Sequence, residues 1–308
     1  MIRFSRPARR LDQTLRIPAG IAFAACLISA STHADPAAIL NDHVLNGRIW
    51  SSGTNQFVTV DTVVAAAKAA DVVFLGEKHD NAEHHRLQAA LLDRLAAHAR
   101  RPALVWEMIK PGDDTVLARA SVIGAAGLGA ALRWADSGWP AWSDYQPLAV
   151  TAIDHDLPMR GAALTRDQVR ALLGGGIDLP DFVTLPLDLM RRDALLDQLE
   201  ASHCGAVPRT ALSGMANVQM ARDAALARVT TETIAAGHVP VVIAGGGHAR
   251  RDWGVPWHLP GRNVLVVTFM EVERGLDDPA DYAAPGAFDF IWFTPRVDEK
   301  DPCARFRR

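Results

Sequence analysis

The chain has 308 residues, of which 49% are hydrophobic and 22% are charged, so it can bury the core of one large domain or two small ones. Its formal net charge at pH 7 is −3. After residue 34, Lys and Arg occur singly or in short groups and form no long basic block. This charge pattern argues against nucleic acid and anionic membrane surfaces as partners.

The first 34 residues have the pattern of a secretory signal peptide. Five arginines precede an apolar run at 21–30, and small residues then end in Ala34, where we predict cleavage. The apolar run is too short to span a bilayer permanently. Cleavage leaves 27 Lys and Arg against 34 Asp and Glu, a formal net charge of −7. We therefore expect the mature protein to cross the inner membrane and reside in the periplasm.

Cysteine usage leaves two alternatives open. The segment 23–26 is a degenerate lipobox, so Cys26 is an alternative lipid-anchored N-terminus, which would tie the protein to the envelope membrane. After cleavage at Ala34 only Cys204 and Cys303 remain. In an oxidising compartment these two can pair and pin the C-terminal tail to the body. Two separate thiols are the equal alternative, because the sequence does not give the distance between them.

Strands and helices alternate along the mature chain. A short hairpin over 47–50 and 56–60 is followed by a helix that Asp61 caps and that reaches about Ala70. A strand at 72–77 precedes a helix from Asp80 to Ala99, with Asp80 and Glu83 as its cap-like start. The later elements are a strand at 103–109, irregular helices at 113–150, a strand at 158–164, helices at roughly 188–201 and 210–236, and strands at 239–244, 264–270 and 288–293.

This alternation predicts an α/β fold: a mostly parallel sheet with helices on both faces and an antiparallel edge at the C-terminus. We expect residues 35–308 to form a single domain. Two stretches, at about 113–150 and 188–236, are predicted as helical insertions that cap the strand ends. The first contains Trp134, Trp139, Trp142 and Tyr145 within twelve positions.

Polar side chains gather where the strand at 72–77 ends. Six Glu, Asp and His residues fall within the nine positions 77–85, beginning with Glu77 and His79. The carboxyl ends of strands are where open α/β sheets place their ligands. A polar strand-to-helix turn would account for one or two such residues but not readily for six.

Two further strands end in ionisable residues. Glu107 lies among apolar neighbours, so it needs a partner, which is either a structural Arg or backbone amide or a functional group. His248 follows three glycines, and both His79 and His248 close a Gly-x-x-His element at the end of a strand. We predict that Glu77, His79, Glu107 and His248 surround one pocket beneath a helical lid.

Four segments carry a resemblance to a known family. Residues 75–88, 105–108, 219–223 and 245–259 resemble the ChaN family, the haem-binding uptake branch of the Tiki superfamily. The resemblance extends from about Gly47 to Leu259 and more loosely beyond. It implies a secreted or lipid-anchored bacterial protein that binds haem, in some members as a homodimer with two haems stacked face to face. Components of a haem receptor or transporter are the partners it implies.

Haem binding requires an axial ligand and an apolar, aromatic-lined slot. Tyr145 is the first candidate ligand, because its segment resembles a Trp-x-x-Tyr-x-Pro segment of the family and a phenolate suits ferric iron. An aromatic side chain packed under the cap is the alternative for Tyr145. The further candidates are His79, His84, His85 and His248, although a solvated pair is the simpler explanation for at least one of His84 and His85. Met215 and Met220 are expected in the core.

Hydrolysis is the second hypothesis. The superfamily also contains Tiki-type metalloproteases and erythromycin esterases, in which paired Gly-x-x-His elements and glutamates line the catalytic site. Glu77, His79, Glu107 and His248 stand at the matching positions. Glu77 or Glu107 would position or deprotonate a water, while the histidines would bind a divalent metal such as zinc or manganese or act as acid and base.

The sequence contains neither His-Glu-x-x-His nor Gly-x-Ser-x-Gly. A third interpretation is an envelope binding module whose polar cluster is a structural hydrogen-bond network. We predict a haem carrier in iron acquisition rather than an enzyme, with the metal-dependent hydrolase as the alternative.

Overall fold

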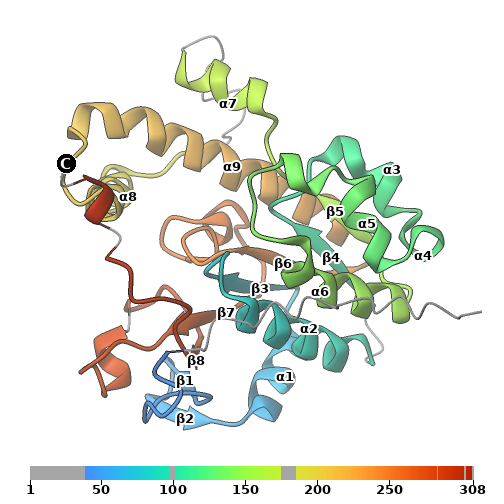
Figure 1. Cartoon of the computed structure of the whole chain (residues 1–308), viewed down its shortest axis with the longest axis horizontal. Helices are drawn as coiled ribbons and strands as arrows, with labels where there is room; N and C mark the ends of the chain where they lie inside the picture. Colours follow the sequence, from blue (N-terminus) through green and yellow to red (C-terminus); the bar gives the residue numbers. More distant parts are fainter. Residues whose placement is uncertain (1–38, 98–100, 175–184, 283, 302, 307–308) are drawn as a thin grey trace, which may run out of the picture. The chain divides into compact units, whose positions relative to one another are not determined.

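Eight strands form one sheet with the order β2-β1-β8-β7-β3-β6-β4-β5 (Figure 1). Parallel pairing joins β3 to β6 and β7, β4 to β5 and β6, and β7 to β8, whereas β1 pairs antiparallel with β2 and β8. The strands are β1 (Ile49–Ser51), β2 (Gln56–Val58), β3 (Val72–Glu77), β4 (Pro102–Trp106), β5 (Met159–Gly161), β6 (Val239–Gly245), β7 (Val264–Glu271) and β8 (Phe290–Thr294). The predicted mostly parallel sheet with an antiparallel edge is confirmed; the edge joins the N-terminal hairpin to the last strand.

The computed structural model describes residues 39–97, 101–174, 185–282, 284–301 and 303–306. All of them belong to the unit Pro36–Arg308. The predicted signal peptide, residues 1–34, lies outside the described residues, as does Cys26. Within the described part of the chain, no helix combines the length and the apolar character that crossing a membrane requires.

Helices cover both faces of the sheet because its central strands are apolar on both sides. Every residue of β3, β4 and β6 is buried. Val73 and Leu75 belong to a core with α1 (Val60–Ala69), α2 (Ala82–Ala96) and α6 (Trp142–Asp154). Val72 and Phe74, pointing the other way, pack with the C-terminal half of α9 (Arg209–Ala235) and with η4 (Val255–His258).

Further helices pack outside the two layers that cover the sheet centre. α8 (Leu189–Ser202) and the N-terminal half of α9 form a separate apolar cluster with Trp253. Among the described residues, the remaining helices are η1 (Pro111–Asp113), α3 (Asp114–Leu117), α4 (Ala120–Ile123), α5 (Ala125–Ala131), η2 (Trp134–Asp136), α7 (Arg166–Leu173), η5 (Pro279–Tyr282) and η6 (Ala304–Phe306). α7 was not predicted, although Thr165 and Gln168 form a capping box at its start.

Two predicted helix starts are wrong by one or two residues. The N-cap of α1 is Thr59, so Asp61 lies in the first turn. The N-cap of α2 is Asn81 rather than Asp80, and its side-chain oxygen accepts hydrogen bonds from two backbone N–H groups. Asn81 also donates to Glu271, so the buried amide fixes the start of α2 against β7, whereas Asp80 is exposed.

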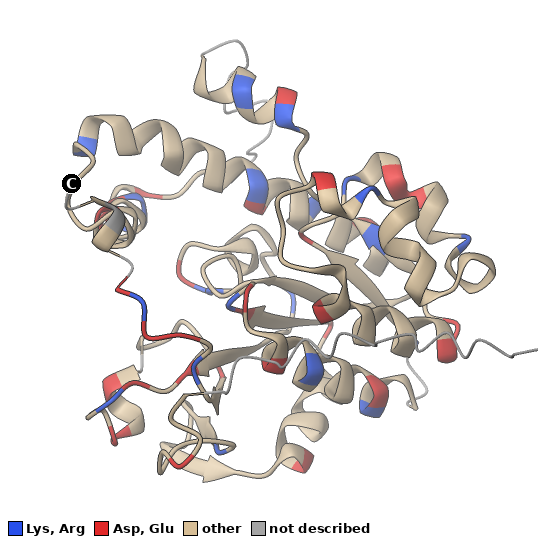
Figure 2. Ribbon diagram, viewed as in Figure 1, with Lys and Arg blue, Asp and Glu red and all other residues tan. Residues whose placement is uncertain are grey.

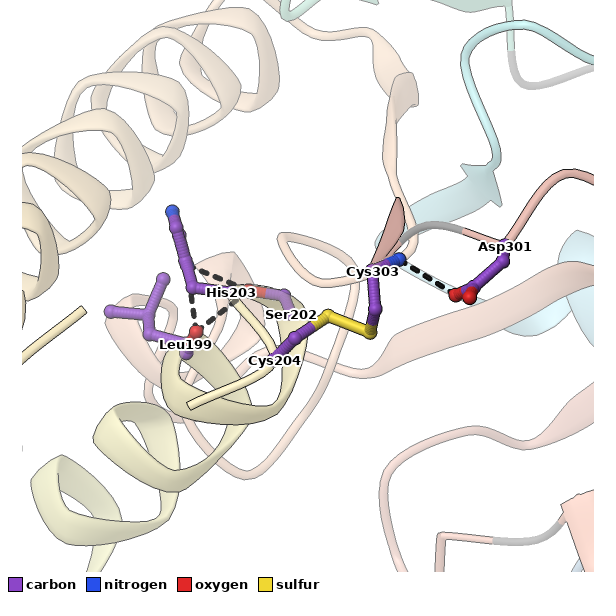
Figure 3. Close-up of a disulfide and its surroundings, with 6 residues drawn as sticks. All are labelled: Leu199, Ser202, His203, Cys204, Asp301 and Cys303. Atoms are coloured by element: carbon purple, nitrogen blue, oxygen red, sulfur yellow. Dashed lines mark hydrogen bonds between the residues drawn. A yellow bond between two sulfur atoms is a disulfide. The ribbon is translucent and has the colours of Figure 1, made fainter. Parts of the chain in front are cut away.

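A disulfide joins Cys204 to Cys303, which are 99 positions apart in the sequence and have Cα atoms 5.6 Å apart (Figure 3). Cys204 follows the C-terminal end of α8, and Cys303 lies in the C-terminal tail. The pairing that the sequence left open is therefore present. It closes a long loop and ties the tail to the helical region.

Candidate functional site

The ends of three adjacent strands bring the four predicted residues together. β6 lies between β3 and β4, so the residues that follow these strands share one edge of the sheet. His79 Nε2 lies 3.9 Å from Glu107 Oε2, and His248 Nε2 lies 3.2 Å from Glu107 Oε1. Glu107 therefore stands between the two imidazoles of the Gly-x-x-His elements.

On the side of α2 and α6, the Glu77 carboxylate holds the other side chains by hydrogen bonds. Its Oε1 lies 2.8 Å from His79 Nδ1 and accepts a hydrogen bond of 2.8 Å from the Tyr145 hydroxyl, while Gln88 donates to Oε2 at 2.8 Å. Burial alone would raise the pKa of this carboxyl. The hydrogen bonds and positive charges of His79 and His85 outweigh burial and hold the pKa well below its usual range.

His248 is held from the opposite face by a residue that the sequence analysis had not named as a site residue. Its Nδ1 lies 2.5 Å from Oδ1 of Asp223, which comes from α9 and is buried. Burial raises the pKa of Asp223 to about 6, although the nearby imidazolium lowers it. Burial lowers the pKa of His248, but the charges of Glu107 and Asp223 raise it to about 9. An ion pair at neutral pH follows from these values.

The two imidazoles have the same arrangement of carboxylates around them. Each directs Nδ1 to a buried carboxylate, Glu77 or Asp223, and turns Nε2 toward Glu107. Burial lowers the pKa of His79, but the hydrogen bond to Glu77 and the charge of Glu107 raise it overall. Because a carboxylate fixes the orientation of a metal-binding histidine, both rings have the arrangement expected of ligands.

Glycines allow the two elements to approach one another. A Cβ on Gly245 would lie 2.8 Å from His79 Nε2, and one on Gly76 would lie 2.9 Å from the Cβ of Ala249. The Gly245 N–H also donates to Glu107 Oε2 at 2.7 Å. The backbone of Gly245 therefore lies beside the His79 ring and also holds the Glu107 carboxylate. The close packing explains a glycine at the start of each Gly-x-x-His element.

Glu107 and His248 line a cavity of about 940 Å³. This volume is near the upper end of the usual range for small-molecule and cofactor sites, about 300–1,000 Å³. Its aromatic and aliphatic walls include Met108, Leu132, Trp134, Trp139, Leu164 and Leu226, and its basic residues are Lys110, Arg133, Arg166, Arg170 and Arg222. Trp139 is also a neighbour of His79, with ring centroids 4.7 Å apart. η2 and α9, which lie in the two predicted insertions, both contribute to the lining.

Tyr145 does not occupy the place expected of an iron ligand. It is fully buried, packs against Trp134 and Trp106, and is not among the residues that line the cavity. Burial and the charge of Glu77, to which its hydroxyl donates, raise its pKa above the ordinary value. The placement matches the alternative of an aromatic packed under the cap, and a role for Tyr145 as an iron ligand stays a prediction.

His84 and His85 are both buried, so the interpretation as a solvated pair is wrong. His84 Nδ1 accepts from the Lys78 N–H at 2.9 Å, its Nε2 lies 2.8 Å from Thr294 Oγ1, and burial lowers its pKa to about 3. His85 stacks on Tyr145, with ring centroids 3.9 Å apart. Neither residue lines the cavity. Met220 is in the core as expected, and Met215 is partly buried beside it.

The donor atoms do not form a preorganised shell for a divalent metal. Within the described ranges, no group of three or more His, Cys, Asp or Glu side chains is arranged to hold a metal ion. Glu77 uses both carboxylate oxygens in hydrogen bonds, and both histidines use Nδ1 in the same way. The two Nε2 atoms, which face Glu107, are the imidazole nitrogens that are placed for a ligand or for proton transfer.

Fold and site together define a ligand-binding or catalytic α/β protein with a histidine–carboxylate array at the carboxyl edge of its sheet. The family described as "Haem-binding uptake, Tiki superfamily, ChaN" matches residues 63–259, and the chain belongs to this family. The resemblance seen in the sequence is confirmed.

One of the solved structures similar to this chain, that of a ChaN protein, shares its fold. The ChaN protein of Campylobacter jejuni, described as binding haem cofacially, has a TM-score of 0.64 at 20% identity, with 79% of this chain and 95% of that chain covered. The type III effector HopBA1 has a TM-score of 0.46 at 18% identity, covering 76% and 92% of the two chains. A mutant of the erythromycin esterase EreC in its open conformation has a TM-score of 0.48 at 12% identity, covering 83% and 99%. No curated protein matches the chain in sequence.

Proposed function

We propose that this protein binds haem in the 940 Å³ cavity and acts in haem uptake. The proposal is supported by membership of a haem-binding uptake family and by the fold shared with a haem-binding ChaN protein. The observation that carries it is a single histidine, held by a buried carboxylate, on the wall of a large cavity with aromatic and aliphatic sides.

The residues that line the cavity fit the three parts of a haem. Trp134, Trp139 and Leu226 offer surface for the porphyrin ring. His248 offers an imidazole nitrogen for the iron. Arginines offer partners for the two propionates. Bound haem would supply an iron centre that exchanges its axial ligands, which suits a protein that accepts and passes on its cargo.

His248 is the proposed iron ligand in place of Tyr145. Its ring lines the cavity, and its Nδ1 donates to Asp223, an arrangement that raises the basicity of the opposite nitrogen. Its Nε2 is paired with Glu107, so an iron that took this nitrogen as a ligand would displace the proton that the pair holds. His79 is the second candidate, since its Nε2 also faces Glu107.

The proposed location is the periplasm, or the envelope membrane if Cys26 carries a lipid. The disulfide between Cys204 and Cys303 supports an oxidising compartment, because such bonds persist there. A haem receptor or transporter is the proposed partner, and a homodimer is the proposed form of the loaded protein.

Titration of the mature chain, residues 35–308, with haemin tests the proposal. We expect a Soret shift that saturates, is retained in Tyr145→Phe and is weakened at least tenfold in His248→Ala. His155→Ala is the matched control, because His155 pairs with Asp93 away from the cavity. Absence of a Soret shift in the wild-type protein would contradict haem binding, and a shift unchanged in His248→Ala would contradict the assigned ligand.

Hydrolysis is a second candidate function, favoured by the position of Glu107 between two Nε2 atoms. A carboxylate in this place can hold a water, and each imidazole can give or take a proton. Cleavage of chromogenic esters and peptides, with and without added zinc or manganese, tests this function. If the protein is a hydrolase, Glu107→Gln will abolish turnover; if no substrate is cleaved under any condition, this candidate fails.

A further inference from the structure

The five basic residues that line the cavity differ in how their charges are balanced. Arg133 pairs with Asp136 at 3.0 Å, Arg170 pairs with Asp167, and Lys110 lies 3.6 Å from Asp113. Each of these three cations therefore has a carboxylate of its own. Among the described residues, neither Arg166 nor Arg222 forms an ion pair with a carboxylate. These two arginines are therefore the lining residues best placed to bind an anion.

Arg222 makes no hydrogen bond or ion pair with any residue in the described part of the chain. It is half-buried on α9, one turn before Leu226, which lines the same cavity. Its sequence neighbour Asp223 directs Oδ1 to His248. The charge of Arg222 lowers the pKa of Asp223, so the guanidinium has an anionic neighbour. Among the described residues no carboxylate hydrogen-bonds to it, so its N–H groups are available to a bound anion.

Arg166 is held in place by hydrogen bonds to neutral backbone groups, which leave its positive charge without a paired carboxylate. In the first turn of α7, its Nη2 donates to the backbone oxygens of Asp136 at 2.5 Å and Ser137 at 3.4 Å. These are neutral acceptors, and the Asp136 carboxylate is used by Arg133. The guanidinium is thus held against η2 on the cavity wall with an unneutralised charge. Figure 2 shows basic positions on both α7 and α9, the helices that carry the two arginines.

We infer that Arg166 and Arg222 form a carboxylate-binding site on the wall of this cavity, so that the protein selects ligands with free carboxylates on an apolar ring. The inference rests on the proposed function and deepens it: the two guanidiniums would bind the two propionates of haem. Arginine suits this role because its planar fork can bind a carboxylate through two parallel hydrogen bonds. Esterified porphyrins would lose this interaction while keeping the ring and the iron.

A comparison of haemin with its dimethyl ester tests the inference, because the two differ only in the propionates. We expect the free acid to bind the wild-type protein about tenfold more tightly or better, as charge-assisted hydrogen bonds require. In Arg222→Gln and Arg166→Gln the advantage of the free acid should shrink. Arg170→Gln is the matched control, since Arg170 lines the same cavity but is paired with Asp167, and it should keep the full advantage.

A second readout does not depend on iron. Quenching of tryptophan fluorescence by metal-free protoporphyrin IX and by its dimethyl ester should give the same preference, because Trp134 and Trp139 line the cavity. Arg222→Gln should leave the thermal midpoint nearly unchanged, since the side chain makes no hydrogen bond or ion pair within the described residues; a lowered midpoint together with an unchanged preference would indicate a structural role and overturn the inference.

Failure of the inference and failure of the proposed function give different results. If haemin and its ester bind equally well, the carboxylate site is wrong and haem binding stands. If neither binds, and protoporphyrin IX causes no quenching, both the proposed function and the site are wrong. If Arg170→Gln reduces the preference as much as Arg222→Gln, the distinction between paired and unpaired arginines is wrong.

Discussion

Two histidine–carboxylate pairs occupy this site, and their surroundings differ. Glu77 and His79 lie where β3 meets α2 and α6, and Glu77 also accepts hydrogen bonds from Gln88 and Tyr145. Asp223 and His248 join α9 to the turn after β6, and no other hydrogen bond reaches the Asp223 carboxylate from the described residues. The first carboxylate is therefore held by several side chains, whereas the second makes a single link between a helix and a cavity wall.

The difference shows in the carboxylates. Hydrogen bonds hold the pKa of Glu77 well below its usual range despite burial, whereas burial dominates at Asp223 and raises its pKa to about 6. The same Gly-x-x-His pattern is thus paired with one carboxylate of lowered pKa and one of raised pKa. The difference arises because the residues that pack against each carboxylate come from other parts of the sequence. We expect the Glu77 pair to matter most for stability and the Asp223 pair to matter most for ligand binding.

The largest effect is expected from Glu77→Gln. The change leaves His79, His85 and Tyr145 facing a neutral amide, and breaking a buried charged network in this way costs about 3–5 kcal/mol of unfolding free energy. Chemical denaturation of the mature chain measures this cost. Asp223→Asn should cost less than half as much, and equal losses in the two variants would contradict the division of roles.

Asp223→Asn should instead lower haem affinity by about 10- to 100-fold, because the amide no longer accepts the His248 proton in the same way and the ring loses its fixed orientation. Titration with haemin in the visible spectrum gives the affinity, and circular dichroism shows whether the fold is retained. If Asp223→Asn is folded and binds haemin with wild-type affinity, the proposed role of His248 as iron ligand is contradicted.

A substitution at Gly245 can disrupt the contact between the two Gly-x-x-His elements. An alanine there would place its Cβ 2.8 Å from His79 Nε2, and overpacking of this kind costs about 1–3 kcal/mol. Gly247→Ala is the matched control, because nothing lies within 4 Å of a Cβ at that position. Thermal unfolding should separate the two variants; similar midpoints would show that the elements are not in close contact.

A smaller effect concerns pH and the side of the site that contains Glu77. Burial lowers the pKa of His84 from 6.5 to about 3 in the folded protein, so the unfolded chain binds the proton first as pH falls. His84 thus favours the folded state fully above about pH 6.5, and this contribution is lost progressively between pH 6.5 and 3, by about 1 kcal/mol per pH unit. Unfolding free energies measured across this range should fall less steeply in His84→Gln. An identical slope would contradict the assignment.

The fold and much of the site could be predicted from the sequence because their signals are local. Continuous apolar runs such as 72–77 indicate strands buried on both faces, and β3 has the predicted bounds. Residues that follow parallel strands share one sheet edge, so Glu77, His79, Glu107 and His248 could be placed together. Helix starts were less certain, since the buried contact of Asn81 with Glu271 depends on tertiary structure.

Residues whose role depends on packing between distant elements were harder to find. Asp223 shares a face of α9 with the buried Ala216 and Met220, and a charged residue on an apolar helical face was the available signal. Tyr145 could not be placed, because an aromatic near an iron site and an aromatic under a cap have the same sequence pattern. That no carboxylate hydrogen-bonds to Arg222 among the described residues follows only from the positions of its neighbours.

The central claim is that His248, held by Asp223, presents its Nε2 to a haem in the cavity. Resonance Raman spectroscopy of the reduced haem-loaded protein tests it most directly. We predict an iron–histidine stretching band that shifts in Asp223→Asn and disappears in His248→Ala. A spectrum without this band, or one that is unchanged in both variants, would contradict the claim.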